Sequence, residues 1–290
     1  MRSQISFVKS KVAPIVKWAG GKRQVIKFLI EKIPLEFENY FEPFVGGAAL
    51  LIELFNRNLI KHAVISDINP DLVNLYVAVK YNPNKICYYI GKLEFSNHEK
   101  DYYKAREIYN SIKLDNLFAA NDENIYKAVL MLYLNRHCYN GLYRVNSKGE
   151  FNVPFGRYKN PHLPGKEEIF SFSEMLQSVE ILHMDFEKAL ECAKEKDFIY
   201  FDPPYMPVSQ TANFTDYTVG GFSKVEQIRL KRTCDKLIQK GCYIMVSNSD
   251  SEFIKNLYRE YNIESIEVNR QINSHADKRK GYKEVIITNY

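Results

Sequence analysis

The chain has 290 residues, of which 46% are hydrophobic and 26% are charged, the proportions of an ordinary soluble globular protein. Its length exceeds one typical core, which favours a large α/β domain with a smaller inserted domain. No window of about 18 apolar residues occurs and the N-terminus lacks an apolar signal-peptide core, so we expect no membrane segment and a cytoplasmic location. The net charge of +5 permits a polyanionic partner without proving one. Five scattered cysteines without a C-x-x-C pair predict reduced thiols and no zinc site.

A first glycine segment, Lys17-Trp18-Ala19-Gly20-Gly21-Lys22-Arg23, precedes an apolar helical pattern over 25–30. Paired glycines ahead of a helix let the backbone come close to a ligand, and a helix N-terminus favours anions. The only tryptophan of the chain, Trp18, lies between two lysines of this segment. On these residues alone, a core tryptophan followed by a loop is the better interpretation.

A second glycine segment follows the pattern of a strand, a tight turn and a helix over 40–55, with Gly46 and Gly47 in the turn. It is not the G-x-G-x-x-G of dinucleotide enzymes, so it gives little support to pyrophosphate binding. About 20 residues later, a strand over 63–66 ends in Asp67, where an acid can bind ribose hydroxyls. Together these features favour a nucleoside ligand without phosphates. The alternative for Asp67 is a cap for the helix that begins around Pro70.

Residues 72–138 show a charged helical pattern without strand alternation, which predicts an inserted helical domain. Two short alternating runs then flank the turn 146–149, a hairpin signature. Basic and aromatic residues interleave along 138–159, namely Arg144, Lys148, Arg157 and Lys159 with Tyr139, Tyr143, Phe151, Phe155 and Tyr158. Basic groups suit phosphates and guanine edges, and aromatic rings can fill a gap in a base stack. We favour DNA contact over the alternative, a solvated hairpin with a half-buried aromatic face.

The remainder of the chain returns to an α/β pattern. A strand over 179–183 leads into Met184-Asp185-Phe186, and a helix over 224–240 is predicted to begin with a capping box formed by Ser223 and Glu226. A strand over 242–246 follows, and residues 263–268 and 282–288 are predicted to form a closing hairpin.

The most informative motif is Asp202-Pro203-Pro204-Tyr205, which directly follows the apolar run 197–201. That run is too short for a helix and is rich in β-branched and aromatic residues, so it predicts a buried parallel strand. Proline has a fixed φ and no N–H, so the strand must stop there, with a carboxylate and an aromatic ring at its carboxyl end. Ligands of open α/β sheets bind at that edge. An acceptor beside a stacking ring suits an exocyclic amino group on a flat heterocycle; a surface turn is the alternative.

With both glycine segments, Asp67 and the Asp-Pro-Pro-Tyr motif in this order, the chain resembles the Dam family of DNA adenine-N6 methyltransferases, and more narrowly its members that modify GATC. The resemblance runs from Lys17 to the C-terminus. It implies a Rossmann-like, S-adenosylmethionine-dependent methyltransferase sheet with helices on both faces, formed by residues 1–70 and 165–290. It also implies an inserted, mostly helical DNA-recognition domain over 71–164 that carries a β-hairpin. The stretch 84–124 matches no motif of the family.

The resemblance implies S-adenosylmethionine as methyl donor, S-adenosylhomocysteine as product, and no metal. The cofactor-binding positions that it implies are Trp18, Ala19, Gly20, Lys22, Glu42, Phe44, Gly46, Asp67, Asp185, Phe186 and Asp202, with Asp185 accepting from the adenine amino group of the cofactor. The positions that match family residues entering or reading DNA are Lys17, Tyr139, Asn140, Leu142, Arg144 and Tyr158, among which Lys17 and Arg144 would read guanine. Lys148 and Arg157 are further candidate DNA contacts.

By the same resemblance the catalytic residues are Asp202, Pro203, Pro204 and Tyr205. Hydrogen bonds from an adenine N6 to the Asp202 carboxylate and the Pro203 carbonyl would localise its lone pair, while Tyr205 stacks on the flipped base. Three alternatives stay open. A cytosine-N4 methyltransferase typically carries Ser at the Asp202 position, and an RNA or protein-glutamine methyltransferase usually carries Asn. An inactive DNA-binding regulator would give Asp202 and Tyr205 no reason to be intact. The expected partner is double-stranded DNA, and the sequence leaves open whether a cognate restriction endonuclease acts on the same site.

Overall fold

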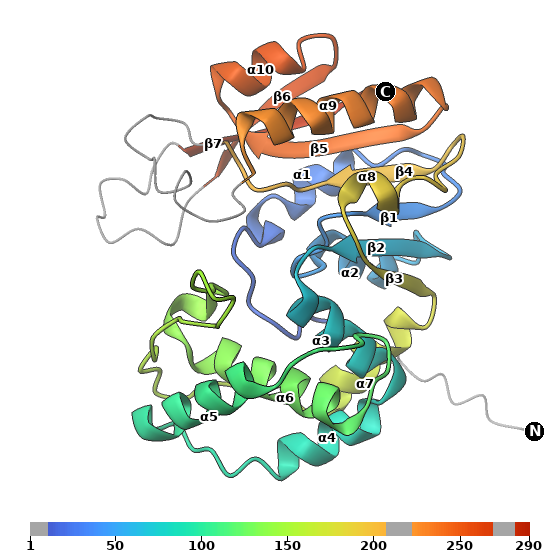
Figure 1. The fold of residues 1–290 in the computed structure, drawn as a ribbon. Coiled ribbons are helices and arrows are strands. Elements are labelled where there is room, and N and C mark those ends of the chain that lie inside the picture. The colour runs from blue at the N-terminus through green and yellow to red at the C-terminus, as the bar shows by residue number, and fades with distance from the viewer. Residues whose placement is uncertain (1–10, 207–221, 269–281) are drawn as a thin grey trace, which may run out of the picture. The chain divides into compact units, whose positions relative to one another are not determined.

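The computed structural model describes residues 11–206, 222–268 and 282–290, which divide into two compact units (Figure 1). The first unit comprises the described parts of Met1–Ala19, Ile52–Leu59 and Pro70–Ser178. The second comprises those of Gly20–Leu51, Ile60–Asn69 and Val179–Tyr290. Each unit is described by itself below.

The second unit is built on a sheet whose described strands have the order β3-β2-β1-β4-β5-β7-β6 (Figure 1). The strands are β1 (Tyr40–Glu42), β2 (Ala63–Asp67), β3 (Val179–His183), β4 (Phe198–Phe201), β5 (Tyr243–Ser249), β6 (Asn262–Val268) and β7 (Tyr282–Thr288). In the spatial order β3-β2-β1-β4-β5, each strand pairs in parallel with its neighbours. Strand β7 pairs antiparallel with both β5 and β6. The order reverses between β1 and β4, and open α/β sheets bind ligands at the carboxyl ends of strands at such a switch point. The sheet therefore points to the residues that follow β1 and β4.

The sheet is covered on both faces, as expected for a mostly parallel sheet. The second unit contributes η1 (Lys22–Gln24), α1 (Ile26–Glu31), α8 (Phe186–Ala189), α9 (Lys224–Gln239) and α10 (Glu252–Leu257). Figure 1 shows α8 and α9 in front of the sheet and α1 behind it. All four residues of β4 are buried, which confirms the predicted buried parallel strand. Phe201, Leu230 and Ile244 belong to the core beneath α9.

Two local predictions in this unit are confirmed with small corrections. Ser223 caps α9 by accepting from the backbone N–H of Glu226 at 3.4 Å, but the second half of the predicted capping box is not observed, and the Glu226 carboxylate accepts from Arg229 at 2.7 Å. The closing hairpin is formed by β6 and β7, in a register that places Ile263 opposite Ile287.

The first unit is mostly helical in its described part. Its helices are α3 (Pro70–Tyr81), α4 (Pro83–Gly91), α5 (Glu99–Ser111), α6 (Asp122–His137), η2 (Tyr139–Gly141) and α7 (Lys166–Leu176). Helix α2 (Ala49–Asn56) has residues in both units, because the division falls between Leu51 and Ile52. Most residues of α6 are buried on every side because α3, α4 and α5 all pack against it. A helix that is buried on most sides in this way forms the centre of its unit.

The predicted hairpin lies between α6 and α7, and its two sides are joined by isolated bridges instead of a continuous β-ladder. Antiparallel bridges join Val145 to Phe151 and Cys138 to Phe155. The main chain of Phe151 bonds to the side chain of Asn110, which accepts from its N–H at 2.9 Å and donates to its carbonyl at 3.1 Å. The hairpin is thereby anchored to α5.

Candidate functional site

The carboxyl end of β4 carries an ion pair between a buried lysine and a partly buried aspartate. Asp202 directly follows this strand, and its Oδ1 lies 2.9 Å from Nζ of Lys22, whose side chain is only 6% exposed. The Lys22 ammonium also donates to the carbonyl of Gly20 at 2.8 Å. The first glycine segment and the Asp-Pro-Pro-Tyr motif, far apart in the sequence, therefore meet at one point of the sheet edge.

The ring of Tyr205 is held by two groups of the second unit. Its hydroxyl donates to Oε2 of Glu284 at 2.8 Å, and Nζ of Lys22 lies 4.6 Å from its ring centroid. Sequence reasoning missed Glu284, because a glutamate within a β-strand pattern gives no signal of such a contact. The antiparallel pairing of β7 with β5, which places Glu284 opposite Ser249, brings it there.

The segment after Asp202 is also fixed by polar side chains of α9 and β5. Gln227 donates to the carbonyl of Pro204 at 3.0 Å, and Asn248 links the two elements by donating to Gln227 at 3.1 Å. Asn248 further accepts from the N–H of Met206 at 3.2 Å. The sequence marks Asn248 only as the end of a strand, so its role in holding this turn becomes visible in the fold.

Burial governs the protonation of the acids at this edge. Burial raises the pKa of Asp202, while the nearby Lys22 ammonium opposes that rise and so favours the carboxylate. Burial raises the pKa of Glu42 to about 8, against a smaller opposing effect of the hydrogen bond from the Tyr40 hydroxyl at 2.8 Å. The site therefore holds an acid that is neutral at pH 7 close to one that is paired with a cation.

The second glycine turn and Asp67 are in contact. Gly46 adopts a φ of +45°, a conformation that favours glycine, and donates its N–H to Oδ2 of Asp67 at 3.1 Å. Oδ1 of Asp67 accepts from the N–H of Asn69 at 2.9 Å. Asp67 therefore stabilises the chain ahead of α3, which begins at Pro70. Burial raises its pKa against these backbone hydrogen bonds.

An aromatic cluster follows β1 and β3. The ring of Phe44 lies 5.3 Å from that of Phe186 and 5.5 Å from that of Phe222. The guanidinium of Arg229 lies 4.3 Å above the Phe186 ring and donates to both carboxylate oxygens of Asp185, at 3.1 and 2.7 Å. A planar group that carries donors is thus stacked on Phe186 and bonded to Asp185.

Several of the expected DNA-contacting residues meet in the first unit. The Lys17 ammonium lies 4.5 Å from the ring centroid of Tyr158. Burial raises the pKa of Tyr158, and the backbone of Asn140 next to it opposes that rise. Tyr139 is 55% exposed, and Leu142 is half-buried. Lys17, Asn140 and Tyr158 thus form one cluster next to an exposed aromatic ring.

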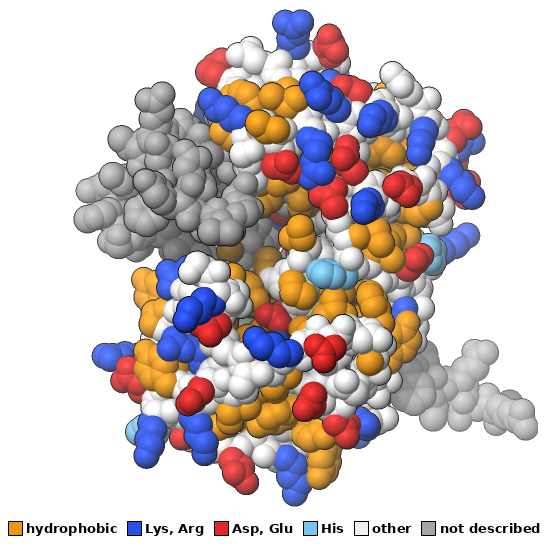
Figure 2. Space-filling view, in the orientation of Figure 1, with side chains coloured by type: hydrophobic (Ala, Val, Ile, Leu, Met, Phe, Trp, Pro, Cys, Tyr) orange, Lys and Arg blue, Asp and Glu red, His pale blue; other side chains and the backbone are white. Residues whose placement is uncertain are grey.

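The basic residues of the hairpin have different environments. Arg144 is exposed, and its Nε donates to Oδ1 of Asn152 across the hairpin at 2.7 Å. Lys148 is exposed at the turn, whereas Arg157 lies 3.6 Å from the carboxylate of Glu99. On the face drawn in Figure 2, basic side chains are interspersed with acidic ones. The charge of that face therefore does not indicate DNA contact, and the residues of the hairpin are the ones that do.

The expected cofactor residues are divided between the units. Trp18 and Ala19 belong to the first unit, where Trp18 stacks on Tyr143 at 5.4 Å. Gly20, Lys22, Glu42, Phe44, Gly46, Asp67, Asp185, Phe186 and Asp202 belong to the second. The relation of Trp18 and Ala19 to the second unit stays a prediction.

The structure offers neither a metal site nor a membrane span in the part of the chain that it describes. Within residues 11–206, 222–268 and 282–290, no group of three or more His, Cys, Asp or Glu is placed to hold a metal ion. Over the same ranges, no helix is long and apolar enough to cross a bilayer.

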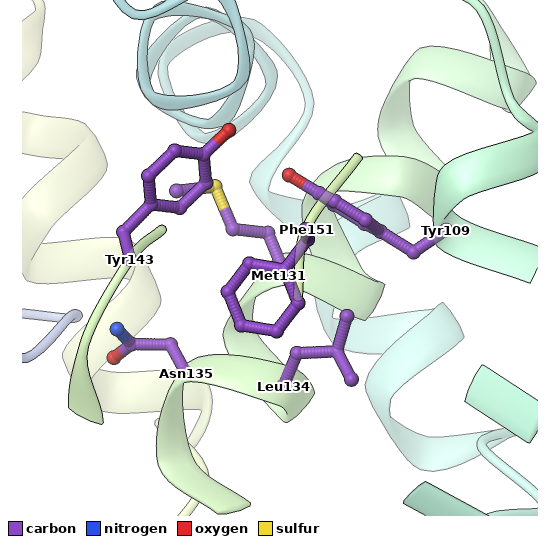
Figure 3. Close-up of a pocket in the computed structure, with 6 residues that line it drawn as sticks. All are labelled: Tyr109, Met131, Leu134, Asn135, Tyr143 and Phe151. Carbon is purple, nitrogen blue, oxygen red and sulfur yellow. The ribbon is translucent and has the colours of Figure 1, made fainter. Parts of the chain in front are cut away.

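A small pocket lies beneath the hairpin of the first unit (Figure 3). Its lining comes from α5, α6 and the hairpin and consists of Tyr109, Met131, Leu134, Asn135, Tyr143 and Phe151. The pocket leaves no room for a water molecule, so it is a packing gap rather than a ligand site.

Comparison with known proteins gives consistent matches over almost the whole chain. Residues 18–272 match the family model of the D12 class N6 adenine-specific DNA methyltransferases. The chain is 40% identical over 284 residues to the type II methyltransferase M1.LlaDCHI of Lactococcus lactis, with 97% of both chains covered. It is 40% identical to the type II methyltransferase M.MjaIII of Methanocaldococcus jannaschii, covering 97% of this chain and 100% of that one. It is 36% identical to the DNA adenine methylase of Haemophilus influenzae, covering 96% and 94%.

Proposed function

Because the chain belongs to the D12 class of N6 adenine-specific DNA methyltransferases, we propose that it methylates the N6 atom of adenine within GATC sites of duplex DNA, with S-adenosylmethionine as methyl donor. The observation that carries this proposal is the Asp202–Lys22 pair at the end of β4, next to the ring of Tyr205. GATC is supported by the resemblance of the segment 140–159 to family members that modify this site.

Asp202 and its neighbours would make the adenine nitrogen nucleophilic. The N6 lone pair is delocalised into the ring, and hydrogen bonds from the amino group to the Asp202 carboxylate and the Pro203 carbonyl localise it. Asp202 must be ionised for this purpose, and the ammonium of Lys22 at 2.9 Å favours that form against the effect of burial. Positioning and electrostatics then supply most of the rate.

Tyr205 would receive the target base after it leaves the helix. An adenine inside a duplex cannot reach the carboxyl end of β4, so the nucleotide must be flipped out, and the ring of Tyr205 provides the surface for stacking. Pro203 and Pro204 fix the backbone between the carboxylate and this ring. Glu284 and Lys22 hold the ring before the base arrives.

The acidic and aromatic side chains of the second unit fit the chemistry of the cofactor. S-adenosylmethionine, when bound, supplies an electrophilic methyl group on a sulfonium ion. Asp67 beside the Gly46 turn would accept from ribose hydroxyls. Arg229 stacks on Phe186 and donates to Asp185, the two contacts that the cofactor's planar adenine and its amino group would make. The Arg229 side chain would therefore move aside when the cofactor binds.

The first unit would recognise DNA and the second would carry out the transfer. Lys17 and Arg144 are the proposed guanine readers, and Tyr139, Asn140, Leu142 and Tyr158 are proposed to enter or read the DNA. Arg144 is held by Asn152, which orients a guanidinium able to bond two acceptors of a guanine edge. Lys148 at the exposed turn is a phosphate contact. Arg157 is a further DNA contact, reached by release from Glu99.

We also propose the cytoplasm of a bacterial or phage-infected cell as the site of action, with duplex DNA as the partner. A restriction endonuclease acting on the same sequence, without a stable complex, is supported by the names of two relatives, which are type II methyltransferases.

The test is single-molecule sequencing of DNA from a methylation-deficient host that expresses the chain. The proposal expects N6-methyladenine in GATC, and N4-methylcytosine or another sequence context would overturn the base or the site. Asp202→Ala should remain folded by circular dichroism and lose about 10²-fold or more of the transfer rate. A folded Asp202→Ala protein that labels DNA with tritiated methyl groups at the parent rate would contradict the catalytic assignment.

A further inference from the structure

A single buried amide holds the residue proposed as the N-terminal guanine reader. Asn135 lies on α6, is 4% exposed, and contacts the main chain of Lys17 twice. Its Oδ1 accepts from the N–H of Lys17 at 2.8 Å, and its Nδ2 donates to the carbonyl of Lys17 at 2.7 Å. Both contacts join residues 118 positions apart in the sequence.

The same amide also holds the turn that carries Asn140. Nδ2 of Asn135 donates to the carbonyl of Gly141 at 3.2 Å, so the amide contacts the segments on both sides. An Asn side chain has two N–H donors, and two carbonyls use them here. Figure 3 shows the Asn135 side chain on α6 below Tyr143, which belongs to the hairpin.

Lys17 and Gly141 fit closely against each other. Gly141 has a φ of +61°, and a Cβ at this position would lie 2.6 Å from both Cβ and Cδ of Lys17. The lysine stem therefore lies in the space that the missing side chain leaves, and its ammonium reaches the Tyr158 ring. The neighbouring Arg136 adds a contact by donating to the carbonyl of Ile15 at 2.9 Å.

We propose that Asn135 is a specificity-determining positioning residue, which sets the location of the Lys17 side chain relative to the turn 139–141 and thereby aligns it with its base. This inference rests on the proposed function. Asn135 acts through Lys17 and does not itself touch DNA, since it is buried.

The chain contains a matched contact for comparison. Asn56 accepts from the N–H of Val12 at 2.9 Å and donates to the carbonyl of Val12 at 2.9 Å. The paired hydrogen bonds to one residue's main chain are of the same kind and lie on the same N-terminal segment as Lys17, but no proposed base reader is involved. Asn→Asp at either position keeps the accepting oxygen and replaces the donor by a second oxygen facing a carbonyl.

The experiment compares Asn135→Asp, Asn56→Asp and the unsubstituted chain. For each, kcat/KM is measured on the recognition site found by sequencing and on duplexes altered at one base pair. Asn135→Asp should lower the ratio of cognate to altered sites by about tenfold at the base pair that Lys17 reads, the size of one good base contact. Asn56→Asp should keep the ratio of the unsubstituted chain, and S-adenosylmethionine affinity should be unchanged in both.

Two further variants separate positioning from general structural damage. Gly141→Ala disturbs the same Lys17 contact from the turn and leaves the Asn135 side chain unsubstituted, and it should lower the same ratio if Asn135→Asp does not fold. In a Lys17→Ala background, Asn135→Asp should cause no further loss of discrimination, because residues acting through one contact are not additive.

The inference is overturned if Asn135→Asp, or Gly141→Ala in its place, keeps the discrimination of the unsubstituted chain. It is also overturned if the effects of Asn135→Asp and Lys17→Ala add. Failure of the proposed function appears separately, as an absence of adenine methylation by the unsubstituted chain.

Discussion

Glu42 provides a test of the electrostatics at the edge of the sheet. The side chain is 3% exposed at the end of β1, and burial raises its pKa from the usual 4.5 to about 8. The hydrogen bond from Tyr40 and the nearby Lys22 lower this pKa, but by less than burial raises it. Glu42→Gln keeps the shape and the carbonyl acceptor and removes the ionisation.

The sign of the effect follows from proton binding. Between pH 4.5 and about 8 the folded protein binds more protons at Glu42 than the unfolded chain does, so the free energy of unfolding falls as pH rises. The slope approaches about 1.4 kcal/mol per pH unit, the equivalent of one pKa unit. Glu42→Gln lacks this slope. The free energy of unfolding of Glu42→Gln, relative to that of the parent, should therefore rise by about 2 kcal/mol between pH 6 and pH 7.5. The difference should level off above the folded pKa of Glu42.

The assay is urea unfolding of both proteins at several pH values, followed by far-UV circular dichroism and by fluorescence. The single tryptophan, Trp18, lies in the first unit, so its fluorescence reports that unit, whereas circular dichroism reports both. A transition seen by circular dichroism and not by Trp18 belongs to the second unit, where Glu42 lies. Glu36→Gln, at an exposed position of the same unit, is the control for removing one acidic residue.

A stability difference that stays constant from pH 5 to pH 8 would refute the reasoning. It would mean that folding does not raise the pKa of Glu42 above its value in the unfolded chain. If Lys22 instead stabilised the carboxylate and lowered its pKa, the difference would change only below about pH 4.5 and not between pH 5 and pH 8.

The other predictions concern binding and turnover. Arg144→Ala should leave cofactor binding intact and lower activity on GATC far more than on sites altered at the guanine it reads, whereas a common factor for all duplexes would exclude base reading. Lys148→Ala should weaken binding to duplexes of every sequence by the same factor and should reduce the salt dependence of binding. Binding titrations at two salt concentrations measure both effects. Asp67→Ala should weaken S-adenosylmethionine binding in calorimetry; tight binding of NAD by the parent, with neither sulfur nucleoside bound, would overturn the cofactor assignment. Tyr205→Phe removes the hydroxyl that donates to Glu284 and keeps the ring, so it should retain more methyl transfer than Tyr205→Ala, which loses stacking worth about 1–3 kcal/mol. Equal rates for the two Tyr205 variants would exclude a stacking role.

Local features of the sequence determine the elements that position the site. The apolar residues of β4 specify a buried strand, and Pro203 and Pro204 end it, because proline can neither donate to a ladder nor adopt a strand's φ freely. Residues 263–268 and 282–288 predict the closing hairpin of β6 and β7, and Ser223 predicts the start of α9. These signals act over a few residues, so they are readable without knowledge of the fold.

Tertiary structure decides the chemistry at those elements. Glu284 reaches Tyr205 only because β7 pairs with β5 in one register, and nothing in the residues around either position specifies that register. Glu42 is neutral at pH 7 because of how deeply it is buried, a property of the packed sheet rather than of its neighbours in sequence. Asn135 contacts Lys17 across 118 positions because α6 runs through the centre of its unit. Desolvation and hydrogen bonding between distant segments depend on the closed fold, so these roles are determined when the chain packs and not before.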